Sequence, residues 1–172
     1  MDTQNYFCLF DLPVQYDIDL HALQSNYRKI QAEVHPDKFV TASPSDRLQS
    51  MQTATLTNEA YQTLKHPTAR ARYLLQLRGV ETLEDSNTAM PADFLMTQME
   101  WREAIEDAQH AKDIDALDVL LRDIQDTGKA LEAAFAKALA DDTQTAAQLV
   151  RKLSFIDKIT ADIRDIISRV ED

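Results

Sequence analysis

The sequence has very little glycine and a single cysteine. Only 2 of its 172 residues are glycine and 5 are proline. Because the turns that join β-strands favour glycine, proline and asparagine, this scarcity argues against a sheet and favours helices. One cysteine, Cys8, cannot form a disulfide within the chain or a cysteine-based metal cluster. It lies in the apolar stretch 6–10, so we expect a buried thiol.

The chain also lacks a long hydrophobic run. No stretch reaches the roughly 18 apolar residues of a membrane-spanning helix. Residues 1–5 have neither the positive charge nor the apolar core of a secretory leader. We therefore expect no membrane span and a cytoplasmic location.

The net charge of −11 is carried by one part of the chain. Residues 1–78 contain 8 lysines and arginines against 8 aspartates and glutamates, whereas residues 79–172 contain 10 against 21. An acidic surface repels phosphate backbones, so we expect no nucleic-acid binding. The unequal charge also suggests that the two parts of the chain address different partners.

The first part of the chain predicts one short helix and two long ones. Residues 6–12 form the short apolar helix, and Asp19 can cap the helix that follows. The apolar stripe of that helix recurs at steps of three and four residues: Leu20, Leu23, Tyr27, Ile30 and Val34. Pro36 ends it, because proline cannot continue a helix. A second long helix is expected over about 46–65. Its inward face is predicted to be Leu48, Met51, Thr55, Tyr61 and Leu64.

The last part of the chain predicts a helical bundle. A helix over 68–77 is followed by Gly79, a good C-terminal cap, and residues 79–91 form a polar linker. Three helices with short connections follow, which favours antiparallel neighbours, at about 92–110, 113–140 and 143–170. The predicted fold is all-α, with domains at 1–78 and 92–172.

The tripeptide His35-Pro36-Asp37 lies between the two long helices, one to two turns after Arg28 and Lys29. Pro36 fixes the backbone of a tight loop, and Asp37 offers a carboxylate that can form charge-assisted hydrogen bonds. The basic pair lies off the apolar stripe and suits an acidic partner surface. Taken alone, the tripeptide could merely cap a helix end, and the basic pair could be an ordinary solvated face.

In this setting the tripeptide resembles that of a J domain. A short apolar helix, an amphipathic helix, the tripeptide and two further helices follow in that family's order over about residues 5–77. The resemblance implies a surface that docks on a DnaK-type chaperone and accelerates its ATP hydrolysis. That surface would comprise His35, Pro36, Asp37, Arg28, Lys29 and Lys38. The chain itself would bind no nucleotide, since two glycines cannot form a phosphate-binding loop, and the resemblance implies a co-chaperone that is no enzyme.

The helix at 92–110 has a second apolar face. With Phe94 as reference, steps of roughly 100° per residue place the bundle core within roughly 40° of it, at Trp101, Ile105 and Ala108. Three large apolar residues lie on the far side beside three acids: Leu95, Met96, Met99, Glu100, Glu103 and Asp107. Exposed clusters of this kind mark binding surfaces. Phe155 lies off the core stripe of the last helix and can be presented beside them. The alternative is that a helix or the linker covers these side chains as ordinary core.

Nearly the whole chain is similar to the HscB family, the J-domain co-chaperones of iron–sulfur cluster assembly. The matching stretches are residues 94–96, 99–100, 102–103 and 150–158. In that family, the matching positions contact the scaffold protein IscU: Leu95, Met96, Met99, Glu100, Glu103, Asp107 and Phe155. Met99 and Asp107 depart from the family's leucine and glutamate. The resemblance implies that the chain activates an HscA-like chaperone and delivers IscU to it, with no metal or cofactor of its own.

Three other functions stay open. The bundle could bind a different client while the J domain keeps its role, or the chain could be a plain helical scaffold. A metal-dependent hydrolase is disfavoured, because the histidines show no i, i+4 pairing and share no ligand motif: His21, His35, His66 and His110.

Overall fold

The computed structural model describes residues 5–82 and 90–172, and this part of the chain forms seven α-helices and one 3₁₀-helix without a β-strand. The all-α prediction is confirmed. The chain divides into two compact units, Met1–Leu74 and Leu75–Asp172. The predicted linker lies partly outside the described residues, and the predicted domain limits stay a prediction.

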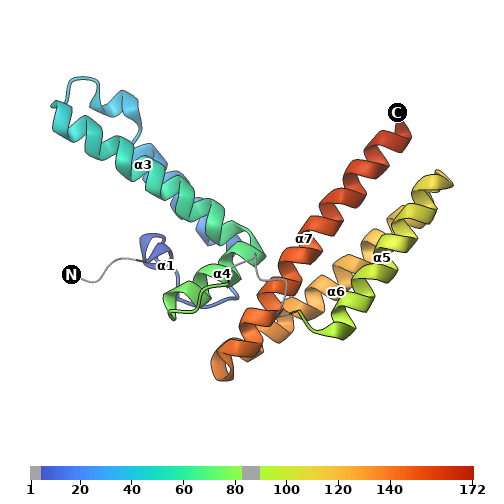
Figure 1. The fold of residues 1–172 in the computed structure, drawn as a ribbon. Helices are drawn as coiled ribbons and strands as arrows, with labels where there is room; N and C mark the ends of the chain where they lie inside the picture. Colours follow the sequence, from blue (N-terminus) through green and yellow to red (C-terminus); the bar gives the residue numbers. More distant parts are fainter. Residues whose placement is uncertain (1–4, 83–89) are drawn as a thin grey trace. The chain divides into compact units, whose positions relative to one another are not determined.

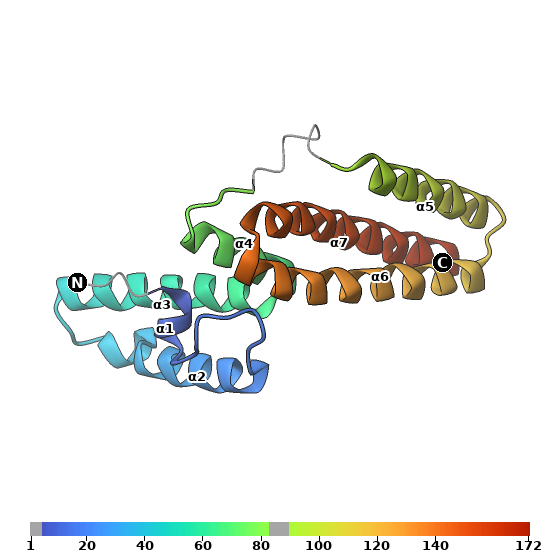
Figure 2. The same cartoon turned by 90° about the horizontal axis from the view of Figure 1, so that it is seen from below.

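The first unit is built on a helical hairpin. Helices α2 and α3 run side by side in opposite directions, and the short 3₁₀-helix η1 lies in the loop that joins them (Figures 1 and 2). The elements are α1 (Tyr6–Leu9), α2 (Leu20–Glu33), η1 (Pro36–Phe39), α3 (Pro44–Lys65) and α4 (Pro67–Leu77), whose last turn belongs to the second unit.

Capping residues set several helix ends where the sequence predicts them. The Asp19 carboxylate accepts hydrogen bonds from the backbone N–H groups of His21 and Ala22 at 3.0 and 3.1 Å, which fixes the start of α2. Gly79 follows α4 with a φ of 76°, and this left-handed conformation lets the N–H of Val80 reach the Leu75 carbonyl. Both predicted caps are confirmed.

Aromatic contacts hold the first unit together. The Tyr27 ring of α2 stacks on Tyr61 of α3 with centroids 4.0 Å apart, and its hydroxyl donates to the Asn58 side chain. The Tyr6 ring stacks on Tyr73 at 4.4 Å, and its backbone N–H donates to the Tyr73 hydroxyl. Burial raises the pKa of the Tyr73 hydroxyl. Ring stacking and polar contacts thus join α2 to α3 and α1 to α4.

The predicted inward face of α3 is wrong at its first three positions. Leu48, Met51 and Thr55 are exposed, whereas Leu64 is buried and Tyr61 half-buried. Small and polar residues form the rest of the buried face: Ser50, Thr57 and Ala60. The Ser50 hydroxyl donates to the Val34 carbonyl at 2.7 Å, so this end of α3 approaches α2 through a short side chain. Hydrophobicity alone therefore points to the wrong side of the helix.

The prediction that the Cys8 thiol is buried is also wrong. Cys8 is exposed on the single turn of α1, whereas Phe7 and Phe10 take the buried positions on either side. A helix of one turn buries only part of an apolar stretch. Leu20, predicted on the apolar stripe, is also exposed at the first position of α2.

The second unit is a three-helix bundle, as predicted. Its long helices lie side by side in Figures 1 and 2, and α5 packs against both α6 and α7. They span α5 (Ala92–His110), α6 (Ile114–Asp141) and α7 (Thr143–Glu171). The core is mainly aliphatic: Ile105, Ala108, Leu117, Ile124, Ile156, Ile159 and Ile163. Gly128 permits the close approach of α6 and α7, since a Cβ there would lie 3.1 Å from Ile156.

Across residues 5–82 and 90–172, no helix combines the length and apolar character needed to cross a membrane. In the same described ranges, no group of three or more histidines, cysteines, aspartates or glutamates is arranged to hold a metal ion.

Candidate functional site

The loop after α2 is held by its own side chains and backbone. Helix α2 ends at Glu33, and Pro36 is the first residue of η1. The backbone N–H of Asp37 donates to Nδ1 of His35 at 3.2 Å, so His35 caps η1. Proline suits this first position because its missing N–H would be unpaired there in any case. Local structure therefore fixes the backbone that carries Asp37.

The Asp37 side chain points into solvent. It is 88% exposed, and its Oδ2 lies 3.5 Å from Nδ1 of His35. That nitrogen can accept from the Asp37 backbone only when it carries no proton, and it can pair with the carboxylate only when it does. In the structure Nδ1 accepts from the Asp37 backbone, and the exposed carboxylate stays available to a partner.

Three basic residues accompany this loop. Arg28 and Lys29 are exposed on α2, and Lys38 is exposed within η1. Arg28 precedes Val34, the C-cap of α2, by six residues, or about 9 Å along the helix axis at 1.5 Å per residue. We call these three residues with the tripeptide 35–37 the loop surface. It combines one exposed carboxylate with several cations.

A second candidate surface lies on α5. Leu95, Met96 and Met99 are 42%, 64% and 72% exposed, and the three neighbouring acids are exposed as well. We call these six residues the α5 outer face: Leu95, Met96, Met99, Glu100, Glu103 and Asp107. The opposite side of α5 is the predicted core side, with Phe94, Ile105 and Ala108 buried and Trp101 half-buried.

The neighbours of α5 show how this face is oriented. Arg102 pairs with Asp162 of α7, so the side of α5 that carries Arg102 lies toward α7. Leu95 is seven residues, or about two turns, before Arg102 and shares that side. Ala104 lies toward α6 on the other flank. Helical spacing places Glu100 and Asp107 nearer that flank. Leu95 and Met99 thus lie nearer α7, Glu100 and Asp107 lie nearer α6, and Met96 and Glu103 lie between them.

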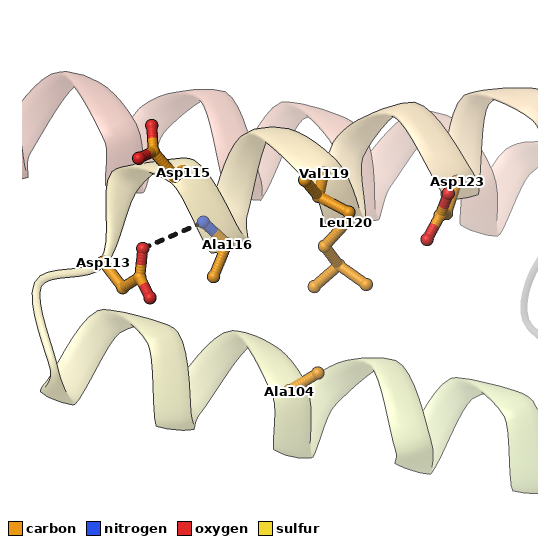
Figure 3. Close-up of a pocket in the computed structure, with 7 residues that line it drawn as sticks. All are labelled: Ala104, Asp113, Asp115, Ala116, Val119, Leu120 and Asp123. Atoms are coloured by element: carbon orange, nitrogen blue, oxygen red, sulfur yellow. Dashed lines mark hydrogen bonds between the residues drawn. The ribbon is translucent and has the colours of Figure 1, made fainter.

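A groove of about 540 Å³ lies beside Ala104 of α5, along the first turns of α6 (Figure 3). Its lining residues are Ala104, Asp113, Asp115, Ala116, Val119, Leu120 and Asp123. The Asp113 carboxylate accepts from the backbone N–H of Ala116 at 3.0 Å and so caps α6. No residue of either candidate surface lines this groove.

Phe155 of α7 is half-buried and packs against α5. Its ring lies edge-on to Phe94 at 5.9 Å and stacks on Trp101 at 6.3 Å, between ring centroids. It therefore contributes to the bundle core while keeping part of its surface exposed. The sequence analysis placed Trp101 in the core but did not predict that Trp101 and Arg102 contact the Phe155 ring. Spacing within one helix could not have revealed these contacts, because they depend on how α5 and α7 pack against each other.

Known proteins resemble the chain over nearly its full length. A family model described as the HSCB C-terminal oligomerisation domain matches residues 90–164. A relative from Paraburkholderia phymatum, named co-chaperone protein HscB homolog, is 48% identical over 98% of this chain and 97% of its own length. The chain belongs to the HscB family of co-chaperones. A relative of the same name from Cupriavidus taiwanensis is 46% identical over 98% and 96% of the two chains.

Solved structures agree with this assignment. HscB from Vibrio cholerae is 38% identical and superposes with a TM-score of 0.86 over 96% of this chain and 99% of its own. Human co-chaperone protein HscB is 30% identical, with a TM-score of 0.90 over 95% and 82%. Membership of the HscB family makes this chain a J-domain co-chaperone of iron–sulfur cluster assembly. The roles of the individual site residues stay predictions.

Proposed function

We propose that this HscB-family chain stimulates the ATPase of an HscA-like DnaK-type chaperone and delivers the scaffold protein IscU to it. One observation carries the first half: Asp37 is almost fully exposed on a loop that its neighbours hold in place. The α5 outer face, on the other unit, carries the second half. Two separate surfaces can bind two proteins at once.

The loop surface suits an acidic groove that also contains a cation or a set of N–H donors. Arg28, Lys29 and Lys38 would steer the encounter with negative charge on the chaperone, chiefly through the association rate. The Asp37 carboxylate would then form the charge-assisted hydrogen bonds that fix the docked orientation. His35 and Pro36 hold the loop backbone, so little ordering is needed on binding.

The α5 outer face suits a partner with an apolar patch and a basic rim. Burying Leu95, Met96 and Met99 would supply the binding free energy, at about 25 cal/mol per Å² of apolar surface. Unbranched methionine side chains can adapt to the partner's shape. Glu100, Glu103 and Asp107 would select positive charge on IscU and exclude acidic surfaces. Phe155 would extend the apolar contact.

The two surfaces make the chain a carrier. Holding IscU on one unit while the other engages the chaperone raises the local concentration of client where ATP hydrolysis is triggered. The chain supplies contacts and no bond chemistry, so the proposal requires no cofactor or metal. Cytoplasmic location belongs to the same proposal.

Steady-state ATPase of the HscA-like chaperone tests the proposal. Adding the chain should raise the rate, and adding IscU with it should raise the rate further than either alone. The chain without chaperone serves as the control and should hydrolyse no ATP. An unchanged rate would contradict the chaperone half. If IscU failed to bind the chain in a pull-down, the bundle would serve a different client.

A further inference from the structure

Three aromatic rings meet between α5 and α7. Phe94 lies edge-on to Trp101 at 6.2 Å and to Phe155 at 5.9 Å, and Trp101 stacks on Phe155 with an interplanar angle of 8°. All three centroid distances fall in the range in which aromatic pairs attract each other. The exposed part of the Phe155 ring therefore depends on neighbours in α5 for its position.

Arg102 reaches the same ring from the solvent side. Its guanidinium carbon lies 5.8 Å from the centroid of Phe155, within the range of a cation–π contact. Its Nη1 also donates to Oδ2 of Asp162 at 3.1 Å. Phe155 and Asp162 are seven residues apart and so lie on one side of α7, about two turns from each other. A single arginine thus touches both.

We propose that Arg102, held by Asp162, is a positioning residue that fixes the Phe155 ring for the scaffold protein. This inference rests on the proposed function of Phe155 as part of the IscU-binding surface. Trp101 supports one side of the ring and Arg102 confines it at the solvent side. The ring is then ordered before the partner arrives, and less side-chain freedom is lost on binding.

The exposure of the ion pair supports a geometric role. The side chains of Arg102 and Asp162 are 44% and 42% exposed, and exposed pairs contribute little to stability. A second ion pair on α7, Arg169 with Asp165, is more exposed, and within residues 5–82 and 90–172 Arg169 makes no cation–π contact. The first pair holds an arginine against an aromatic ring and the second does not, so the second pair is a matched control for the first.

The first test uses the full chain alone. Trp101 is the only tryptophan, so its indole resonances are unambiguous, and their nuclear Overhauser contacts with the Phe155 ring can be measured directly. Arg102→Gln and Asp162→Asn should both weaken these contacts and increase the mobility of the ring. Arg102→Lys should retain them in part, and Arg169→Gln should leave them unchanged. Contacts unchanged in Arg102→Gln would overturn the proposal.

The second test measures affinity for IscU. Arg102→Gln should weaken binding about 3- to 10-fold, the factor expected for losing the prior ordering of one side chain. In a Phe155→Ala background, Arg102→Gln should have no further effect, because the ring through which it acts is gone. An equal loss in both backgrounds would overturn the proposal and assign Arg102 a direct contact.

The two tests separate this inference from the proposed function. If the wild-type chain bound no IscU, the function of the α5 outer face would fail, while the ring contacts would still decide whether Arg102 positions Phe155. If IscU bound and the ring contacts did not depend on Arg102, only the positioning role would fail. Thermal unfolding of the Arg102, Asp162 and Arg169 variants should match the wild type within a few degrees, and the Phe155→Ala background should unfold at the same temperature with and without Arg102→Gln.

Discussion

The two units of this HscB-family chain present binding surfaces in different ways. In the first unit, a single carboxylate is exposed beside cations on a loop whose backbone is fixed by a proline and a histidine cap. In the second, a row of flexible apolar side chains is exposed on a long helix that is anchored by its opposite side. One surface depends on geometry and charge, and the other on apolar area.

This difference determines which substitutions each surface should tolerate. A change of one charge at fixed shape should disable the loop surface, since no neighbour can replace the carboxylate. On the α5 outer face a single truncation should weaken binding only in part, because the other apolar side chains keep their contacts. The two functions should therefore be separable by mutation, with each variant affecting one partner.

The largest effect is expected for a combined truncation of the second surface. Replacing Leu95, Met96 and Phe155 by alanine together should weaken IscU binding by about 100-fold or more, because each buried large apolar side chain is worth about 1.5–3 kcal/mol. Titration calorimetry measures this loss. Val119→Ala is the control, since Val119 is exposed on the same bundle but outside the surface. Unchanged IscU affinity in the triple variant would favour a different client.

The packing of the bundle gives the next largest effect. Gly128→Leu should lower the free energy of unfolding by about 1–3 kcal/mol, because a Cβ at this position would already lie 3.1 Å from Ile156 and a larger side chain would force the helices apart. Denaturation followed by Trp101 fluorescence reports on this unit. Ala130→Leu, on the exposed side of α6, should leave stability nearly unchanged. Equal stability of both variants would argue against close packing at Gly128.

Charge reversal on the loop surface should have a smaller effect. Arg28→Glu should slow association with the chaperone about tenfold at low salt and less at high salt, as expected for steering by exposed charge. Stopped-flow binding at two salt concentrations measures the change. Lys65→Glu, at the far end of α3 from η1, is the matched control. A loss of the same size for both variants would indicate a general effect of net charge.

The smallest effect concerns the start of α7. The hydroxyl and backbone N–H of Thr145, with the N–H of Gln144, hold the pKa of Asp142 below its ordinary value. The carboxylate therefore contributes stability that is complete above its unfolded-state pKa and lost as the pH falls through the lowered folded-state value. The melting temperature of Asp142→Asn should lie slightly below that of the wild type at pH 7 and approach it in acid. A difference that grows in acid would contradict this assignment.

The sequence predicts the bundle better than the hairpin, for a physical reason. In α5, α6 and α7 most buried positions are large and apolar, so their spacing identifies the core. In α3 the buried face includes Ser50, Thr57 and Ala60, while Leu48 and Met51 face solvent. Hydrophobic periodicity does not identify the buried face where a close contact between helices requires small residues. Cys8 is exposed for a different reason, because α1 has a single turn and buries only part of the apolar stretch.

The candidate surfaces follow from the sequence in part. The exposure of Leu95, Met96 and Met99 follows from their angles around α5. The three-ring contact of Phe155 and the reach of Arg102 to Asp162 do not, because they depend on how α5 and α7 are placed against each other. Likewise, the loop motif predicts Asp37, but the hydrogen bond by which His35 holds it is visible only in the structure.

The measurement that tests the central claim most directly is chaperone ATPase with Asp37→Asn. Asparagine keeps the shape of the side chain and removes the charge, and hydrogen bonds to charged groups are worth about 1.5–3 kcal/mol. Stimulation should therefore fall by about 10- to 100-fold, while affinity for IscU stays at the wild-type value. Stimulation at the wild-type level would contradict the assignment of Asp37 as the group that activates the chaperone.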